Sequence, residues 1–73
     1  MIVYTPFWNT LRERGETTYS LIQKHHISSG TLDRLRKNRA ISTTTLNDLC
    51  TILHCRVEDI LEFIPDGEPG KKT

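Results

Sequence analysis

The sequence of 73 residues predicts an all-α domain, folded as a compact bundle of five short helices. Apolar residues recur at the three- and four-residue spacing of amphipathic helices in successive segments of the chain. Serine, threonine, proline and glycine stand between these segments, where they can begin and end helices. No segment shows the clear alternation of apolar and polar residues that indicates a strand, although residues 2–4 could form a short extended arm.

The first predicted helix begins at Thr5 and ends at Arg14. Thr5 offers a hydroxyl that can cap the helix, and Pro6 suits the first helical position because the N–H that proline lacks would be unpaired there. Gly15 can adopt the left-handed conformation that ends many helices. The apolar residues at helical spacing are Phe7, Trp8 and Leu11.

The second predicted helix covers residues 18–24, and the third covers residues 28–37. Thr17 and Ser28 are expected to cap them, and Ile27 is the apolar residue of the tight turn between them. The side chains expected to face the core are Leu21, Ile22, Thr31, Leu32 and Leu35. Those expected to point outward from the third helix are Ser29, Gly30, Asp33, Arg34 and Lys37.

A fourth helix is predicted after Ser42, and a short fifth helix before Pro65. Asn38 can end the third helix, and Ser42 can cap the fourth. The apolar residues of the fourth helix are Leu46, Leu49, Cys50 and Leu53, and those of the fifth are Val57, Ile60, Leu61 and Ile64. We therefore expect one domain over residues 1–64 and a flexible C-terminal tail over residues 65–73.

Size and composition exclude several classes of protein. A chain of 73 residues buries only about 60% of its unfolded surface, which disfavours a deep catalytic cleft. No nucleophile motif or glycine-rich phosphate loop is present, so we expect no enzyme activity and no cofactor. We also expect no small-molecule ligand, because the sequence contains no ligand domain. Apolar runs are too short for a membrane span and the N-terminus does not resemble a signal peptide, which favours the cytoplasm.

The two cysteines, Cys50 and Cys55, lie among apolar residues. We expect both to be reduced core thiols, because free cysteine is among the most often buried residue types. A zinc site that included His54 would lack a paired-cysteine motif and a fourth ligand, so no metal site is expected.

Charge is distributed unevenly, although the net charge of the chain is only +1. Residues 24–39 contain five basic residues and one acidic residue, and residues 47–68 contain six acidic residues and one basic residue. Such asymmetry suggests one basic working face, as nucleic-acid binding requires.

Two short helices joined by a tight turn form an arrangement that suits the DNA major groove. The helix of residues 18–24 would support the helix of residues 28–37, whose N-terminal turn would then point at base edges. Arg34 is the best candidate to read a base, because arginine matches the paired acceptors of guanine. The residues expected to contact phosphates are Thr18 and Ser28 through helix N-termini, the cations Arg36, Lys37 and Arg39, and the hydroxyls of Thr43 and Thr44.

The chain resembles the phage repressor and Cro-like helix-turn-helix family of transcriptional regulators, also called XRE-type. The resemblance spans residues 4–64. Within the family, the chain looks most similar to the small single-domain bacterial members. Its first anchor consists of Thr17, Thr18, Leu21, Ile22, Lys24, Ile27, Ser28, Thr31, Leu32, Arg34 and Leu35. Its second anchor consists of Ile41, Ser42, Thr45, Leu46, Leu49, Cys50, Leu53, Cys55, Asp59, Ile60 and Leu61.

This resemblance implies a lambda-repressor-like five-helix domain that binds DNA as a dimer. The family's base-reading positions fall on Ser29, Gly30, Asp33 and Arg34. Its phosphate-binding positions fall on Thr18, Ser28 and the residues after Lys37. The chain departs from the family pattern at Ile22, which is usually alanine, and at His26, which is usually a turn glycine. His26 would therefore need a left-handed backbone or a changed turn.

Two functions fit the sequence. The first is a sequence-specific regulator of transcription, a repressor or activator that binds a two-fold symmetric operator as a homodimer. Phe63 and Ile64, or an N-terminal arm with Tyr4 and Trp8, could form the subunit interface. The second is a protein-interaction module, antitoxin-like or a co-regulator, whose acidic residues Glu58, Asp59 and Glu62 bind a basic protein.

Overall fold

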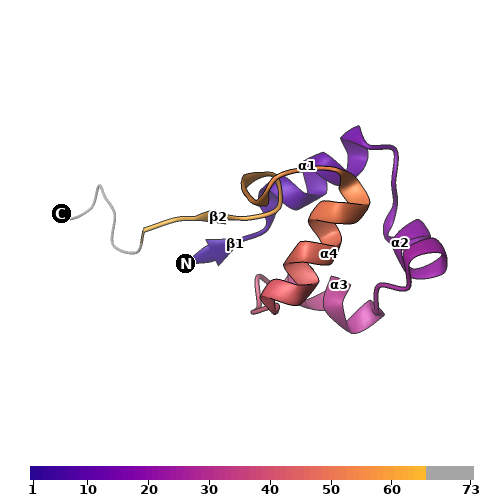
Figure 1. Cartoon of the computed structure of the whole chain (residues 1–73). Coiled ribbons are helices and arrows are strands. Elements are labelled where there is room, and N and C mark those ends of the chain that lie inside the picture. The colour runs from indigo at the N-terminus through magenta and orange to yellow at the C-terminus, as the bar shows by residue number, and fades with distance from the viewer. Residues whose placement is uncertain (66–73) are drawn as a thin grey trace.

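The computed structural model describes residues 1–65 as four α-helices, one 3₁₀ turn and a two-stranded sheet (Figure 1). The helices are α1 (Thr5–Glu13), α2 (Thr18–His25), α3 (Ser29–Arg36) and α4 (Thr43–Leu53). The other elements are β1 (Ile2–Val3), the 3₁₀ turn η1 (Val57–Asp59) and β2 (Glu62–Phe63). The expected C-terminal tail over residues 65–73 lies outside the described residues except for Pro65.

The prediction of five helices in an all-α fold is wrong in one part of the chain. The segment after α4 forms η1 and then β2, which pairs antiparallel with β1, so that Ile2 lies opposite Phe63 and Val3 opposite Glu62. A helix as short as the one expected over residues 57–64 is marginal by itself. Pairing with β1 instead satisfies the backbone of both strands, and it confirms the expected extended arm at the N-terminus.

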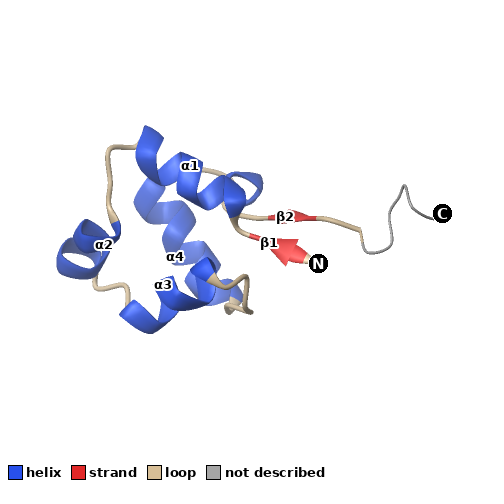
Figure 2. Cartoon of the chain, turned by 180° about the vertical axis from the view of Figure 1, so that it is seen from behind, coloured by secondary structure: helices blue, strands red, loops and turns tan. Residues whose placement is uncertain are grey.

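The core lies where α1, α3 and α4 meet, and α2 closes it at the end away from the sheet (Figures 1 and 2). Its fully buried side chains are Phe7, Leu21, Leu32, Leu35, Leu49, Leu53 and Ile60. Two expectations for apolar residues need correction. Ile22 is 36% exposed on the outer side of α2, because the adjacent Leu21 takes the inward position. Tyr4 is only 3% exposed, so its side chain is not available for a subunit interface.

The expected caps of three helices are confirmed. The side-chain oxygens of Thr17, Ser28 and Ser42 each accept a hydrogen bond, at 3.0–3.1 Å, from the backbone N–H three residues later. Thr5 is not a cap: it is the first residue of α1, and Tyr4 precedes the helix without a side-chain cap. The constrained φ of the proline in the first turn helps to start α1 without that cap.

Left-handed backbone conformations mark the helix ends. Gly15 adopts φ 71°, as its position after α1 predicted, and three residues with side chains do the same: His26 (59°), Asn38 (56°) and His54 (52°). Asn38 lies directly after Lys37, the residue that caps the C-terminus of α3. The next residue, Arg39, donates its N–H to the carbonyl of Arg34 at 2.8 Å. This bond returns the chain across the end of α3.

His26→Gly is expected to raise the free energy of unfolding by about 0.5–1 kcal/mol, because glycine adopts a positive φ without the steric cost that histidine has. The matched control is Gln23→Gly, which is expected to lower stability by a similar amount because Gln23 is an exposed residue inside α2. Urea denaturation measures both, and a loss of stability in His26→Gly would contradict the strain assigned to this turn.

Candidate nucleic-acid interface

The turn between α2 and α3 fixes the two helices to the core and to each other. Ile27 is 9% exposed, and its N–H donates to the carbonyl of Leu21 at 3.1 Å. Leu32 and Leu35, on the inner face of α3, are at most 1% exposed. Because this face is committed to the core, the opposite face of α3 is held toward solvent (Figure 2).

The predicted base-reading residues all lie on the exposed face of α3: Ser29, Gly30, Asp33 and Arg34. At Gly30 an added Cβ would meet nothing nearer than the Ser28 hydroxyl at 3.8 Å, so the N-terminal turn of α3 offers an open approach to its backbone. The side chain of Arg34 has no hydrogen bond or ion pair to any residue within 1–65. Arg34 is thus the cation on this face that is free to bond a ligand.

Two other cations at the C-terminal end of α3, Arg36 and Lys37, are partly engaged. Lys37 Nζ lies 3.2 Å from Asp33 Oδ2, and both side chains are more than half exposed. An exposed pair of this kind is worth about 0–1 kcal/mol, so a phosphate can replace the carboxylate. Arg36 instead turns toward α1, where its guanidinium lies 5.9 Å from the centre of the Trp8 ring. The Trp8 ring in turn packs edge-on against the buried Phe7 ring, with ring centres 4.8 Å apart. Arg36 therefore makes its cation–π contact with a ring that is held by the core.

The predicted phosphate ligands on α2 and α4 lie at helix N-termini. Thr18 is the first residue of α2 and is half-buried, whereas Thr43 and Thr44 begin α4 and are exposed. Ser28 is exposed, but its hydroxyl is occupied by the N–H and hydroxyl of Thr31, at 3.1 and 2.9 Å. Any phosphate contact at Ser28 therefore uses its backbone more readily than its side chain.

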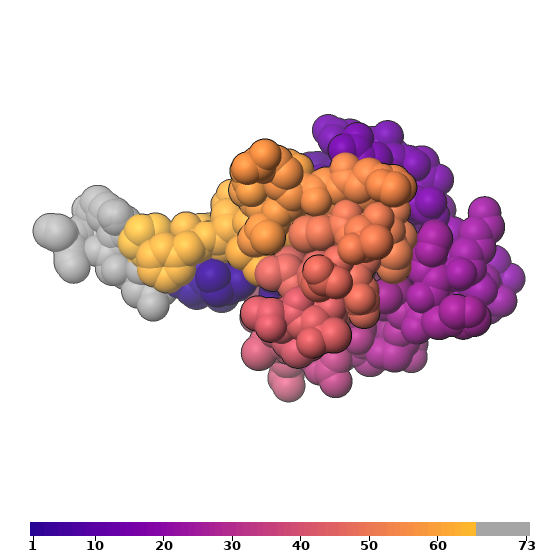
Figure 3. Space-filling model, in the orientation of Figure 1, coloured from indigo at the N-terminus to yellow at the C-terminus, as the bar shows by residue number. Residues whose placement is uncertain are grey.

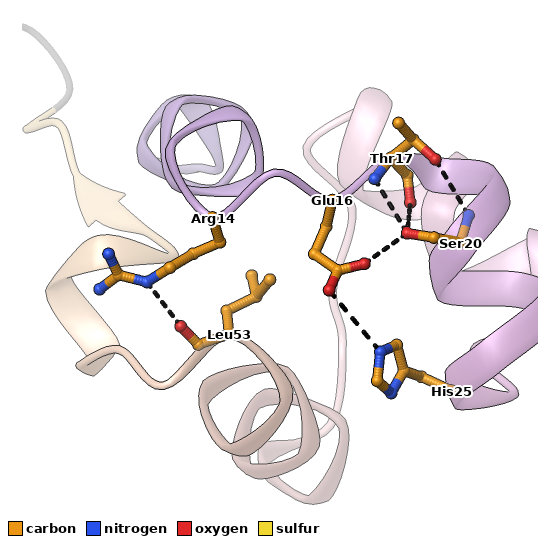
Figure 4. Close-up of polar contacts among 6 residues, drawn as sticks. All are labelled: Arg14, Glu16, Thr17, Ser20, His25 and Leu53. Atoms are coloured by element: carbon orange, nitrogen blue, oxygen red, sulfur yellow. Dashed lines mark hydrogen bonds and ion pairs between the residues drawn. The ribbon is translucent and has the colours of Figure 1, made fainter.

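A polar network holds the start of α2 in place (Figure 4). Thr17 and Ser20 exchange two hydrogen bonds, each 3.0 Å long. The Glu16 carboxylate accepts a hydrogen bond from the Ser20 hydroxyl at 2.5 Å, and its other oxygen lies 3.9 Å from His25 Nε2. Both ends of α2 are thereby tied to the linker that follows α1.

The same linker is also joined to the end of α4. Arg14 Nε donates to the carbonyl of Leu53 at 2.8 Å (Figure 4). Its Nη2 donates to the carbonyl of His54 at 3.3 Å. These two carbonyls end a helix and have no partner within it, so the guanidinium satisfies them and complements the helix dipole. α2 is therefore supported from the body of the domain and not only through α3.

Both cysteines are free and half-buried against the core. Burial, together with the neighbouring Cys50 and Asp59, raises the pKa of the Cys55 thiol to about 11. Cys55 therefore stays protonated at neutral pH and is a poor metal ligand. Among the described residues, no group of three histidine, cysteine or acidic side chains could hold a metal ion.

Sequence reasoning missed two contacts around α3. One is the support that Trp8 gives to Arg36, and the other is a pair of hydrogen bonds from Tyr4 to the chain after α3, to Asn38 Oδ1 at 3.1 Å and to the Arg39 carbonyl at 2.7 Å. Sequence spacing offers no signal for either contact, because the partners lie 28 or more residues apart.

A helix with a locked inner face, a cationic outer face and a supporting helix across a tight turn defines a helix-turn-helix DNA-binding domain. The profile described as the Cro/C1-type HTH DNA-binding domain matches residues 7–66, and the chain belongs to this family. The resemblance noted in the sequence is thus confirmed.

A solved structure agrees with this assignment. The chain is similar to the crystal structure of the transcriptional regulator VanUg, with 31% sequence identity and a TM-score of 0.79 over 89% of this chain and 87% of that chain. No curated protein is significantly similar to the chain. In the described part of the chain, no helix has the length and apolarity needed to cross a membrane.

Proposed function

We propose that this protein is a sequence-specific transcriptional regulator that reads the DNA major groove with α3. The observation that carries the proposal is Arg34: its guanidinium is unpartnered within residues 1–65, on a helix whose other face is locked in the core. A rigidly mounted arginine without internal partners is suited to the two acceptors of guanine. The protein acts without a cofactor and without catalysis, in the cytoplasm where its DNA lies.

Each exposed residue around α3 has a distinct role in this proposal. Arg34 reads a base, and Ser29 and Gly30 permit close approach of the helix to the groove. Asp33 stands beside the bases, and a phosphate replaces it as the partner of Lys37 when DNA binds. The residues that contact phosphates are Thr18, Ser28, Arg36, Lys37, Arg39, Thr43 and Thr44, and these contacts set the register without reading sequence.

Selection of bound sequences from a random pool of duplexes tests the proposal. We expect a consensus in which each half-site contains a guanine at the position that Arg34 reaches, and a steep fall of affinity with salt. Binding that shows the salt dependence but no consensus would contradict specific regulation. It would favour the alternative, a protein-interaction module whose DNA binding has no sequence preference.

The operator is expected to be two-fold symmetric, because we propose that the protein binds as a homodimer. The candidate interface is the arm formed by β1 and β2, which projects from the helices in Figure 3. Apolar side chains are exposed along it: Met1, Ile2, Phe63 and Ile64, with Phe63 65% exposed. Beside the arm lies an apolar cavity of about 370 Å³, lined by Ile2, Tyr4, Ile41, Leu46 and Leu61 among others.

A second copy of the chain fits this arm better than another partner does. An isolated two-stranded sheet is marginal in water, and both of its strands here are edges. In a two-fold dimer each copy offers the same protruding side chains and the same cavity, so both are covered at once.

Phe63→Ala is expected to weaken the dimer about a hundredfold, because a two-fold dimer loses two phenylalanine side chains and burial of each contributes about 1.5 kcal/mol. Sedimentation equilibrium measures the change, with Tyr19→Ala as control because Tyr19 is also exposed but lies on α2. A wild-type protein that stays monomeric at high concentration, and on DNA, would contradict the dimer.

The alternative function has less support from the acidic side of the chain. The carboxylate of Glu58 pairs with Arg56 Nε at 3.0 Å, and Asp59 Oδ2 accepts the N–H of Arg56 at 3.1 Å. These carboxylates are thus partly used inside the chain, which lowers their attraction for a basic protein.

A further inference from the structure

The chain that leaves α3 is held to the N-terminal strand by Tyr4 and Asn38. Asn38 adopts φ 56°, and its Oδ1 accepts the N–H of Tyr4 at 3.1 Å. The Tyr4 hydroxyl donates to the carbonyl of Arg39 at 2.7 Å. The tyrosine ring is 3% exposed, so it is itself fixed by the core. We call Tyr4 and Asn38 the arm clamp.

The arm clamp immobilises Arg39 from one side, and α3 immobilises it from the other. The N–H of Arg39 donates to the carbonyl of Arg34 at 2.8 Å, and its own carbonyl accepts the Tyr4 hydroxyl. The side chain of Arg39, in contrast, is exposed and makes no hydrogen bond or ion pair with the described residues 1–65. The chain therefore presents a free guanidinium on a fixed backbone, directly beyond the C-terminus of α3.

The Tyr4 phenol keeps the proton that it donates to the Arg39 carbonyl. Burial raises its pKa above the usual 10.0, while a backbone hydrogen bond at Ile41 acts in the opposite direction. The hydroxyl is therefore protonated at physiological pH and can donate its proton to the Arg39 carbonyl.

We propose that Tyr4 and Asn38 are positioning residues for DNA binding: they hold the backbone of Arg39 so that its guanidinium meets the phosphates beside α3. Neither residue touches DNA. The inference rests on the proposed function above and assigns part of the phosphate affinity to the N-terminal arm. A cation whose backbone is already ordered loses less conformational entropy when it binds.

The test compares two hydroxyl deletions that are matched in chemistry. Tyr4→Phe removes the donor to Arg39 and keeps the buried ring. Thr10→Val is the control: the Thr10 hydroxyl, equally buried on α1, donates to the carbonyl of Asp59 at 2.8 Å, away from α3. Asn38→Gly is a second variant, in which glycine retains the left-handed backbone but lacks the acceptor for Tyr4.

We expect Tyr4→Phe and Asn38→Gly each to raise the Kd for a selected duplex about threefold or more. We also expect the dependence of Kd on salt to become weaker in both variants, by up to about one phosphate contact, and so to approach that of Arg39→Ala. Thr10→Val is expected to change neither quantity, although its melting temperature falls as much as that of Tyr4→Phe. The double variant Tyr4→Phe/Arg39→Ala is expected to bind like Arg39→Ala alone, because the hydroxyl acts through Arg39.

Two results would overturn the inference: a Tyr4→Phe protein that binds DNA like Thr10→Val, or a Tyr4→Phe effect that adds in full to that of Arg39→Ala. A wild-type chain that binds no duplex would remove the proposed function and this inference together. Wild-type binding with an unaltered Tyr4→Phe protein would remove this inference alone.

Discussion

Phe7→Ala is expected to lower the free energy of unfolding by about 3–5 kcal/mol, because it deletes a buried ring and leaves a cavity. Phe7 is fully buried, and its N–H donates to the carbonyls of Tyr4 and Ile60 at 3.0 and 3.1 Å. A domain of 73 residues has a total stability of about 4–11 kcal/mol, so this variant loses a large share of it. Thermal unfolding should show a fall in midpoint of at least about 12 °C.

The control for this prediction is Phe63→Ala, which removes the same side chain from a position that is 65% exposed. At a concentration where the protein is monomeric, its stability should stay within about 0.5 kcal/mol of the wild type. Equal losses in the two variants would mean that Phe7 does not hold the core together.

Arg34→Ala is expected to weaken binding to the selected operator by about 1–3 kcal/mol, or roughly five- to 150-fold in Kd. The guanidinium has no partner within residues 1–65, so its removal leaves no unpaired group behind and the loss reports its contact with DNA. The preference for guanine at one position of each half-site should disappear. Competition binding with single-base variants of the operator measures both effects.

Lys37→Ala is the matched control for Arg34, since it removes a neighbouring cation from the same helix end. It should weaken all duplexes similarly and flatten the salt dependence by about one contact. If Arg34→Ala lowers affinity equally for selected and unrelated duplexes, Arg34 binds phosphate and another residue reads the base.

The helices of this fold could be predicted because their signals are local. Thr17, Ser28 and Ser42 each stand three residues before the N–H that they cap, and the apolar residues that follow repeat at helical spacing. The segment of residues 57–64 has that spacing too, but its structure depends on a distant partner. The pairing of Val3 with Glu62 decides it, and helical periodicity contains no information on such a pair.

In the candidate site, too, contacts between residues close in sequence could be predicted and contacts between distant residues could not. The Asp33–Lys37 pair is separated by four residues on one helix and could have been expected from the sequence. The placement of Arg36 over Trp8 and of Tyr4 beside Asn38 depends on how α1 packs against α3. Ile22 shows the remaining difficulty: two adjacent apolar residues compete for one inward position, and packing geometry chooses Leu21.

The pairing of β1 with β2 has a consequence for biosynthesis. The first strand to leave the ribosome must wait for residues near position 62 before it finds its partner. The helices can assemble by short-range contacts well before that, whereas closure of such a long loop is slow. We therefore infer that the sheet forms last. A nascent chain truncated before residue 62 would leave the backbone N–H and C=O groups of its N-terminal strand unpaired, and other chains could pair with them.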